Sequence, residues 1–144
     1  MPNRKRELAD EEDSAWSELW DILRDVDVAR SEEPGFTEEW SVKDLTAHLG
    51  CWQAEAVQIF EQMRNSTYVR TPIDVDAMNR RFVEACRDLP PSVVRADLWS
   101  ARSRMLLEWN LLQEVTPDAE EWFVESGAEH YREHLPRLRE WVGT

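Results

Sequence analysis

Apolar residues recur along this chain at steps of three and four, and little in the sequence interrupts them as a β-sheet would require. The clearest stripe consists of Val42, Leu45, Leu49, Trp52, Ala56, Ile59 and Met63. This spacing is typical of a helix that packs one face into a core. The 144 residues include only four glycines, and no Asn-Gly or Asp-Gly pair is present to form a tight hairpin. The pattern predicts an all-α fold.

Four long amphipathic segments are expected, joined by short breaks. They cover residues 7–29, 42–65, 91–112 and 126–142. Ser41 followed by Asp44 predicts a capped start for the second segment. A shorter helix near residues 75–89 is expected to lie across the others, and Pro90 and Pro91 are expected to end it. The sequence therefore predicts a four-helix bundle with an additional short helix between helices 2 and 3, forming a single domain over residues 1–144.

Charge and hydropathy limit the partners that this chain is expected to have. The formal net charge is −13, and nucleic-acid binding depends on Lys and Arg that displace counterions, so we expect no nucleic-acid partner. The sequence contains no apolar run of 18 residues, and acidic residues follow the basic start where a signal peptide would be apolar. These features predict a cytoplasmic protein with no membrane partner.

The two cysteines and four of the tryptophans are expected to pack in the apolar core. Cys51 and Cys86 lack the CxxC spacing of a metal or redox motif, so they are expected to be buried small hydrophobic residues. Four tryptophans stand at core spacing and are expected to fill volume rather than to stack on a ligand; they are Trp16, Trp52, Trp99 and Trp109.

The three histidines of the chain, His48, His130 and His134, fall toward the inner sides of two expected helices. At about 100° per residue, His48 lies about 60° from the centre of its apolar stripe. On the last helix, His134 lies about 40° and His130 about 80° from the apolar line. Their i, i+4 spacing places both imidazoles on one side of the helix, with Cβ atoms roughly 6 Å apart. The three rings are therefore candidates to share one divalent metal ion.

Three neutral imidazoles suit zinc, nickel or ferrous iron, and they leave coordination positions for water or substrate. A bound water or substrate thiolate would be activated there. Nearby carboxylates are candidates to orient the ring nitrogens; they are Asp44, Glu55, Glu129 and Glu133. The alternative is that the histidines are ordinary polar residues, because an HxxxH pair is common on surface helices and inward histidines often only form hydrogen bonds.

Two segments carry motifs that resemble a known superfamily. Residues 40–52, WSVKDLTAHLGCW, resemble the W-S-V-K-D-h-h-A-H-h-x-x-W signature of DinB-like proteins, which include the mycothiol-dependent maleylpyruvate isomerases. Residues 129–141, EHYREHLPRLREW, resemble the last helix of that superfamily. The run Asp74–Asn79 and the Arg-Phe pair after it are similar to a segment of the ClbS/DfsB-like branch, whose founding members protect cells from a DNA-damaging metabolite.

The resemblance implies a four-helix bundle, often a homodimer, whose metal is held by His48 on helix 2 and by His130 and His134 on the last helix. It implies a metal-dependent thiol transferase, isomerase or hydrolase that acts on a small electrophilic molecule. A low-molecular-weight thiol such as mycothiol is the implied second cofactor. Two positions depart from the pattern. His130 stands where the maleylpyruvate isomerases have a Glu. Ser126-Gly127 stand where the ClbS/DfsB-like branch commonly has Asn-Thr.

Two non-enzymatic functions stay open beside this one. The first is a ClbS/DfsB-like protein that binds or sequesters a small molecule for self-protection. The second is a scaffold that dimerises through an apolar helix face, with the histidines as ordinary polar residues. The sequence assigns no catalytic base, and metal content is the observation that would separate the enzyme from the two alternatives.

Overall fold

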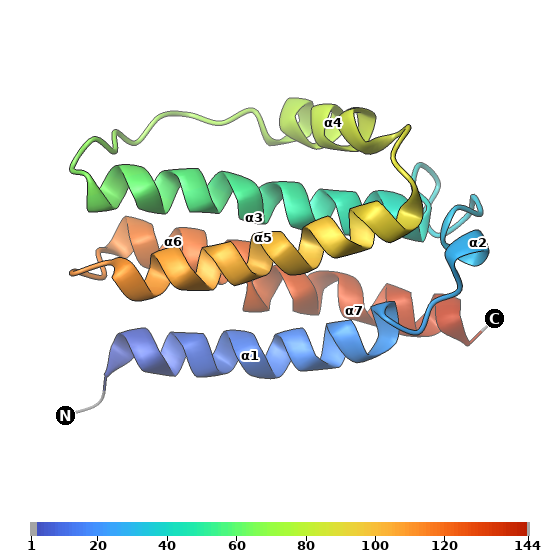
Figure 1. Cartoon of the computed structure of the whole chain (residues 1–144), viewed down its shortest axis with the longest axis horizontal. Coiled ribbons are helices and arrows are strands. Elements are labelled where there is room, and N and C mark those ends of the chain that lie inside the picture. The colour runs from blue at the N-terminus through green and yellow to red at the C-terminus, as the bar shows by residue number, and fades with distance from the viewer. Residues whose placement is uncertain (1–2, 144) are drawn as a thin grey trace.

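The fold is described by a computed structural model that places residues 3–143, and these residues form seven helices and no strand. The helices are α1 (Arg4–Leu23), α2 (Val28–Ser31), α3 (Val42–Arg64), α4 (Val75–Cys86), α5 (Pro91–Leu111), α6 (Pro117–Ser126) and α7 (Ala128–Val142). Figure 1 shows α1, α3 and α5 as long, nearly aligned rods, while α6 and α7 together complete the fourth side of the bundle. The predicted four-helix bundle with an additional short helix, α4, is confirmed.

Side-chain caps fix where the main helices begin. Ser41 Oγ accepts a hydrogen bond from the backbone N–H of Asp44 at 3.2 Å, and Asp44 Oδ2 accepts one from the backbone N–H of Ser41 at 3.0 Å. This is the predicted capping box, and it satisfies two N–H groups that the first turn of a helix leaves unpaired. Because α3 starts at Val42, His48 lies in its second turn.

The first predicted helix is shorter than its apolar pattern suggested. It ends at Leu23 instead of residue 29, and a separate single turn, α2, follows. Asp27 precedes α2, and its side chain accepts hydrogen bonds from the backbone N–H groups of Ala29 and Arg30 at 2.9 and 3.4 Å. A short polar side chain that binds nearby backbone in this way competes with helix continuation, which explains the break.

The last predicted helix, residues 126–142, corresponds to α7, and the prediction missed α6, which precedes it. Thr116 Oγ1 accepts a hydrogen bond from the backbone N–H of Ala119 at 3.1 Å, and Pro117 occupies the first position of α6. A Thr-Pro-Asp sequence is typical of a break between helices, but the same residues can begin a helix. Gly127 then separates α6 from α7: a Cβ atom there would lie 2.8 Å from the carbonyl oxygen of Phe123 and 3.1 Å from Cγ of Glu12.

Helix α4 lies along the outer face of α3 (Figure 1). The prediction that this helix crosses the bundle is therefore wrong. None of its residues is fully buried. Its Cys86 brings Sγ to 3.9 Å from Sγ of Cys51 on α3, and both thiols are free and half-buried rather than buried in the core. Burial and the neighbouring Cys86 raise the pKa of the Cys51 thiol to about 12, so the thiol is protonated at neutral pH.

The apolar core forms two clusters along the bundle, one around Leu45 and Tyr131 and one around Phe60 and Trp109. Trp16 and Trp109 are buried in it as predicted. The prediction is wrong for Trp99, which is 54% exposed because the preceding residue of α5, Leu98, takes the inward position. Across residues 3–143, no helix has both the length and the apolar character that crossing a lipid bilayer requires.

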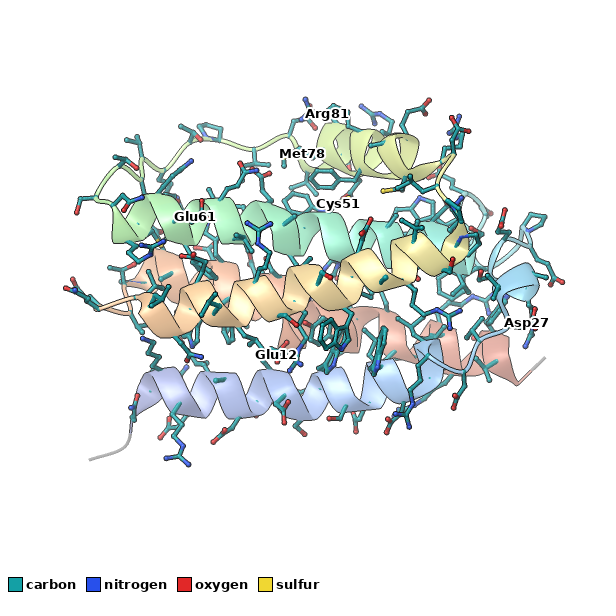
Figure 2. All side chains as sticks on the ribbon, in the orientation of Figure 1. Glu12, Asp27, Cys51, Glu61, Met78 and Arg81 are labelled. Carbon is teal, nitrogen blue, oxygen red and sulfur yellow. The ribbon has the colours of Figure 1, made fainter. Side chains whose placement is uncertain are left out.

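One polar network joins four helices inside this core. Arg102 of α5 donates two hydrogen bonds to the fully buried carboxylate of Glu12 on α1, at 2.7 and 2.9 Å (Glu12 is labelled in Figure 2). The Tyr131 hydroxyl of α7 donates to Glu12 at 2.8 Å and accepts a bond from the Gln53 side chain of α3. A paired and hydrogen-bonded charge is the form in which a carboxylate is tolerated inside a protein.

Candidate metal centre

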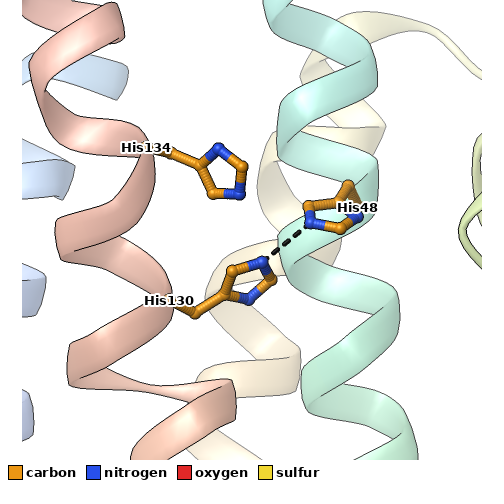
Figure 3. Close-up of side chains that lie close together, drawn as sticks. All are labelled: His48, His130 and His134. Carbon is orange, nitrogen blue, oxygen red and sulfur yellow. Dashed lines mark hydrogen bonds between the residues drawn. The ribbon is translucent and has the colours of Figure 1, made fainter. Parts of the chain in front are cut away.

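The three histidines converge from two helices on one point. Figure 3 shows the His48 ring of α3 facing the His130 and His134 rings of α7. His48 Nε2 and His130 Nε2 are 2.7 Å apart, and the three rings offer nitrogen atoms that all lie within 4.8 Å of one another. The ring centroids are separated by 4.6 to 5.3 Å. The structure therefore brings together all three residues that the sequence indicated.

The surroundings of the triad favour uncharged imidazoles. Burial and the neighbouring His134 lower the pKa of His48 to about 4, while burial and the other two rings lower the pKa of His130 to about 3. Burial also lowers the pKa of His134, against an opposing attraction from Glu133. All three rings are neutral at pH 7, which is the form that binds a metal.

Three of the triad's buried nitrogens have no hydrogen-bond partner among residues 3–143; they are His48 Nδ1, His130 Nδ1 and His134 Nε2. A buried polar atom without a partner costs free energy, and it often marks a missing ion or water. Neutral imidazole nitrogens directed at a common point are suitable ligands for a divalent transition metal. The residues present therefore fit such an ion.

The carboxylates that were predicted to orient the rings do not bond to them. Asp44 is engaged in the cap of α3, and no carboxylate in the described part of the chain forms a hydrogen bond with a ring of the triad. Trp40 lies against the triad instead, with its ring centroid 4.6 Å from that of His48 and 6.4 Å from that of His134. The apolar indole shields this side of the triad from water.

A cavity of about 810 Å³ opens beside the triad, between α3, α6, α7 and the segment of residues 68–75 that leads into α4. Its lining includes all three histidines and four aromatic side chains, which are Trp40, Trp52, Tyr68 and Trp122. The Trp52 indole N–H donates to Asn79 Oδ1 at 2.6 Å, which connects α3 to α4 at the cavity wall. This role of Trp52 was not predicted because the residue stands at core spacing, and that of Trp122 was not predicted because its helix, α6, was not expected.

The pKa shifts of the triad predict how acid affects the metal-free protein. An unfolded histidine takes up its proton near pH 6.5, but the folded His48 and His130 do so only near pH 4 and pH 3. Between these values the unfolded state binds more protons, so the free energy of unfolding falls as the pH falls. We expect a loss of about 4 kcal/mol between pH 7 and pH 5, to which each of the two histidines contributes about half, relative to a His48→Gln/His130→Gln variant. The free energy of unfolding is measured in urea at a series of pH values for both proteins. If it falls by the same amount in both as the pH is lowered, the prediction is wrong.

Comparison with known proteins gives one family match. The model of the mycothiol maleylpyruvate isomerase N-terminal domain matches residues 13–141 of this chain. No curated protein sequence matches the chain.

Several solved structures share the fold. The colibactin self-resistance protein ClbS, solved in complex with a double-stranded DNA, aligns with a TM-score of 0.83 at 17% identity over 97% of this chain and 96% of its own. An uncharacterised protein from Escherichia coli UTI89 aligns with a TM-score of 0.83 at 18% identity over 99% of this chain and 95% of its own. The Sibling Lethal Factor Precursor DfsB aligns with a TM-score of 0.82 at 14% identity, over 99% and 97%. Identities this low establish a common fold.

The prediction that excluded a nucleic-acid partner is wrong, because ClbS, which has this fold, was solved with a double-stranded DNA. The prediction rested on the formal net charge of −13, which is a sum over the whole molecule. Contacts to phosphates depend instead on the local arrangement of Lys, Arg and backbone N–H groups. Net charge therefore does not exclude nucleic acid for a chain with this fold.

Proposed function

This chain belongs to the mycothiol maleylpyruvate isomerase N-terminal domain family of DinB-like proteins, and from that membership we propose that His48, His130 and His134 hold one divalent metal ion. The observation that carries the proposal is the convergence of three neutral imidazoles, two of them buried, beside a cavity of about 810 Å³. When bound, zinc, nickel or ferrous iron would act as a Lewis acid and lower the pKa of a water or thiol that it binds.

We propose further that the cavity is the substrate site of a metal-dependent transferase, isomerase or hydrolase that acts on a small electrophilic molecule. The volume is within the range of sites that enclose small ligands, and its aromatic walls would bind the apolar part of such a molecule. Trp40 would limit the access of bulk water to the triad. A low-molecular-weight thiol such as mycothiol would supply the nucleophile. The homodimer, the cytoplasmic location and the single domain over residues 1–144 stay predictions.

Titration of metal-stripped, untagged protein with cobalt(II) tests this function. We expect uptake of one ion per chain, because the triad supplies one set of ligand atoms within 4.8 Å. A visible absorption spectrum typical of low coordination number should develop, and it should change when a small thiol such as 2-mercaptoethanol is added. If the ion is not taken up stoichiometrically, the metal proposal is wrong. If the ion binds but the thiol leaves the spectrum unchanged, the thiol cofactor is excluded.

A second function, binding or sequestration of a small molecule without catalysis, is favoured by the shared fold with the self-resistance protein ClbS. In that case the aromatic cavity alone would hold the ligand, and the histidines would contribute only polar contacts. Ligand binding that persists after the metal has been stripped, in a protein without turnover of electrophiles, would support this function over the enzyme.

A further inference from the structure

Four glutamates of α6 and α7 line the cavity that opens beside the triad, and one of them, Glu121, is paired with Arg70. Glu125, Glu129 and Glu133 all line the cavity and are exposed, which places them at its mouth. Among residues 3–143, none of the three forms an ion pair with a Lys or Arg side chain. Burial together with Glu121 and Glu129 raises the pKa of Glu125, as expected for carboxylates that repel one another.

The cavity lining contains little positive charge to offset these carboxylates. Arg70 is the only Lys or Arg among the described residues that line it. Its guanidinium is already bound to Asp118 at 2.5 Å and to Glu121 at 3.2 Å, an arrangement that attaches the 68–75 segment to α6. The mouth of the cavity therefore carries an excess of negative charge.

Aromatic faces lie on the other walls of the same cavity. Trp52 and Trp122 have ring centroids 6.4 Å apart, and Trp40 and Tyr68 complete the aromatic lining. The face of an indole attracts a cation, and the attraction increases where water is excluded. At its inner end the cavity reaches the buried rings of His48 and His130, so it is a recess that extends into the protein rather than an acidic patch on an open surface.

We propose that this cavity selects a small organic cation, consisting of an ammonium group on an apolar or aromatic body, as its substrate class. The inference rests on the proposed function, because it takes the cavity beside the triad as the substrate site. The glutamates at the mouth attract the positive group, and the indole rings bind both the cation and the apolar body. A dicarboxylate would be repelled by the same three side chains.

Three ligands with one body and different charge test the proposal: benzyltrimethylammonium, benzyl alcohol and benzoate. Binding to the metal-stripped protein is measured at low ionic strength by quenching of tryptophan fluorescence, since three tryptophans line the cavity. We expect the cation to bind about tenfold more tightly than the alcohol, from cation–π contacts and Coulomb attraction together, and benzoate to bind most weakly. Added salt should reduce the preference, because exposed charges are screened.

The Glu125→Gln/Glu129→Gln/Glu133→Gln variant should lose most of the preference for the cation. A control variant, Glu18→Gln/Glu33→Gln/Glu114→Gln, removes three exposed carboxylates away from the cavity and should retain it. Equal affinity of the native protein for cation and alcohol, or a preference that survives in the first variant, would overturn the proposal. Because no metal is present, this result is independent of whether the triad binds an ion.

Discussion

The His48→Ala variant should fail to take up a divalent ion under conditions in which the native protein binds one per chain. His48 is the one ligand of the proposed triad that comes from α3, and without it the centre keeps only the two imidazoles of α7. Loss of a residue that merely orients a ligand typically costs 10- to 100-fold in metal affinity, so loss of a ligand itself should cost at least about 100-fold. The stabilisation that added zinc gives the native protein in thermal unfolding should also disappear.

Thr46→Ala is the matched control for this variant. Thr46 is buried two residues before His48 on the same helix, and its hydroxyl bonds only to the backbone carbonyl of Val42. This variant should keep the metal, as shown by elemental analysis and by titration. If His48→Ala bound zinc with native affinity, His48 would not be a ligand and the proposed centre would be wrong.

The second large effect is expected in the buried polar network. Arg102→Ala removes the partner of the fully buried Glu12 carboxylate and leaves it with only the Tyr131 hydroxyl. Breaking a buried ion pair by removing one partner typically costs about 3–5 kcal/mol, because the other charge stays uncompensated. We expect a loss of that size in the free energy of unfolding, measured in urea or guanidinium chloride.

Two further variants test the cause of that loss. In Glu12→Gln/Arg102→Met the buried charge is removed together with its partner. The free energy of unfolding of this double variant should fall by less than the sum of the losses in Glu12→Gln and Arg102→Met measured separately. Arg24→Ala removes an exposed arginine whose bond to Asp21 is largely solvated, and it should change stability by less than about 1 kcal/mol. If Arg102→Ala costs no more than Arg24→Ala, the network does not stabilise the fold as proposed.

Local patterns predicted the parts of this structure that depend on neighbouring residues. The Ser41–Asp44 cap and the apolar stripe behind it predicted α3 within one residue at each end. The i, i+4 spacing of His130 and His134 placed both rings on one side of α7, and the triad then required only that α3 and α7 lie next to each other. A four-helix bundle commonly supplies such a contact.

The parts that the sequence did not predict depend on how distant segments meet. The cavity exists because residues 68–75 and α6 lie beside α3, and the Arg70 contacts to α6 span 48 and 51 residues of sequence. The approach of Cys51 to Cys86 likewise depends on where α4 packs. Trp99 shows the limit of periodicity, since a residue close to the edge of an apolar stripe can turn toward solvent.

The break at Gly127 also has an electrostatic consequence for one of the triad's rings. Because a new helix begins immediately after it, His130 lies in the first turn of α7, where unpaired N–H groups create a positive potential. That potential opposes a positive charge on the imidazole and so favours the neutral ring. In a single continuous helix through residues 117–142, the same ring would lie near the middle, beyond the reach of the terminal field. The interruption of the backbone therefore helps to set the protonation state of a side chain three residues away.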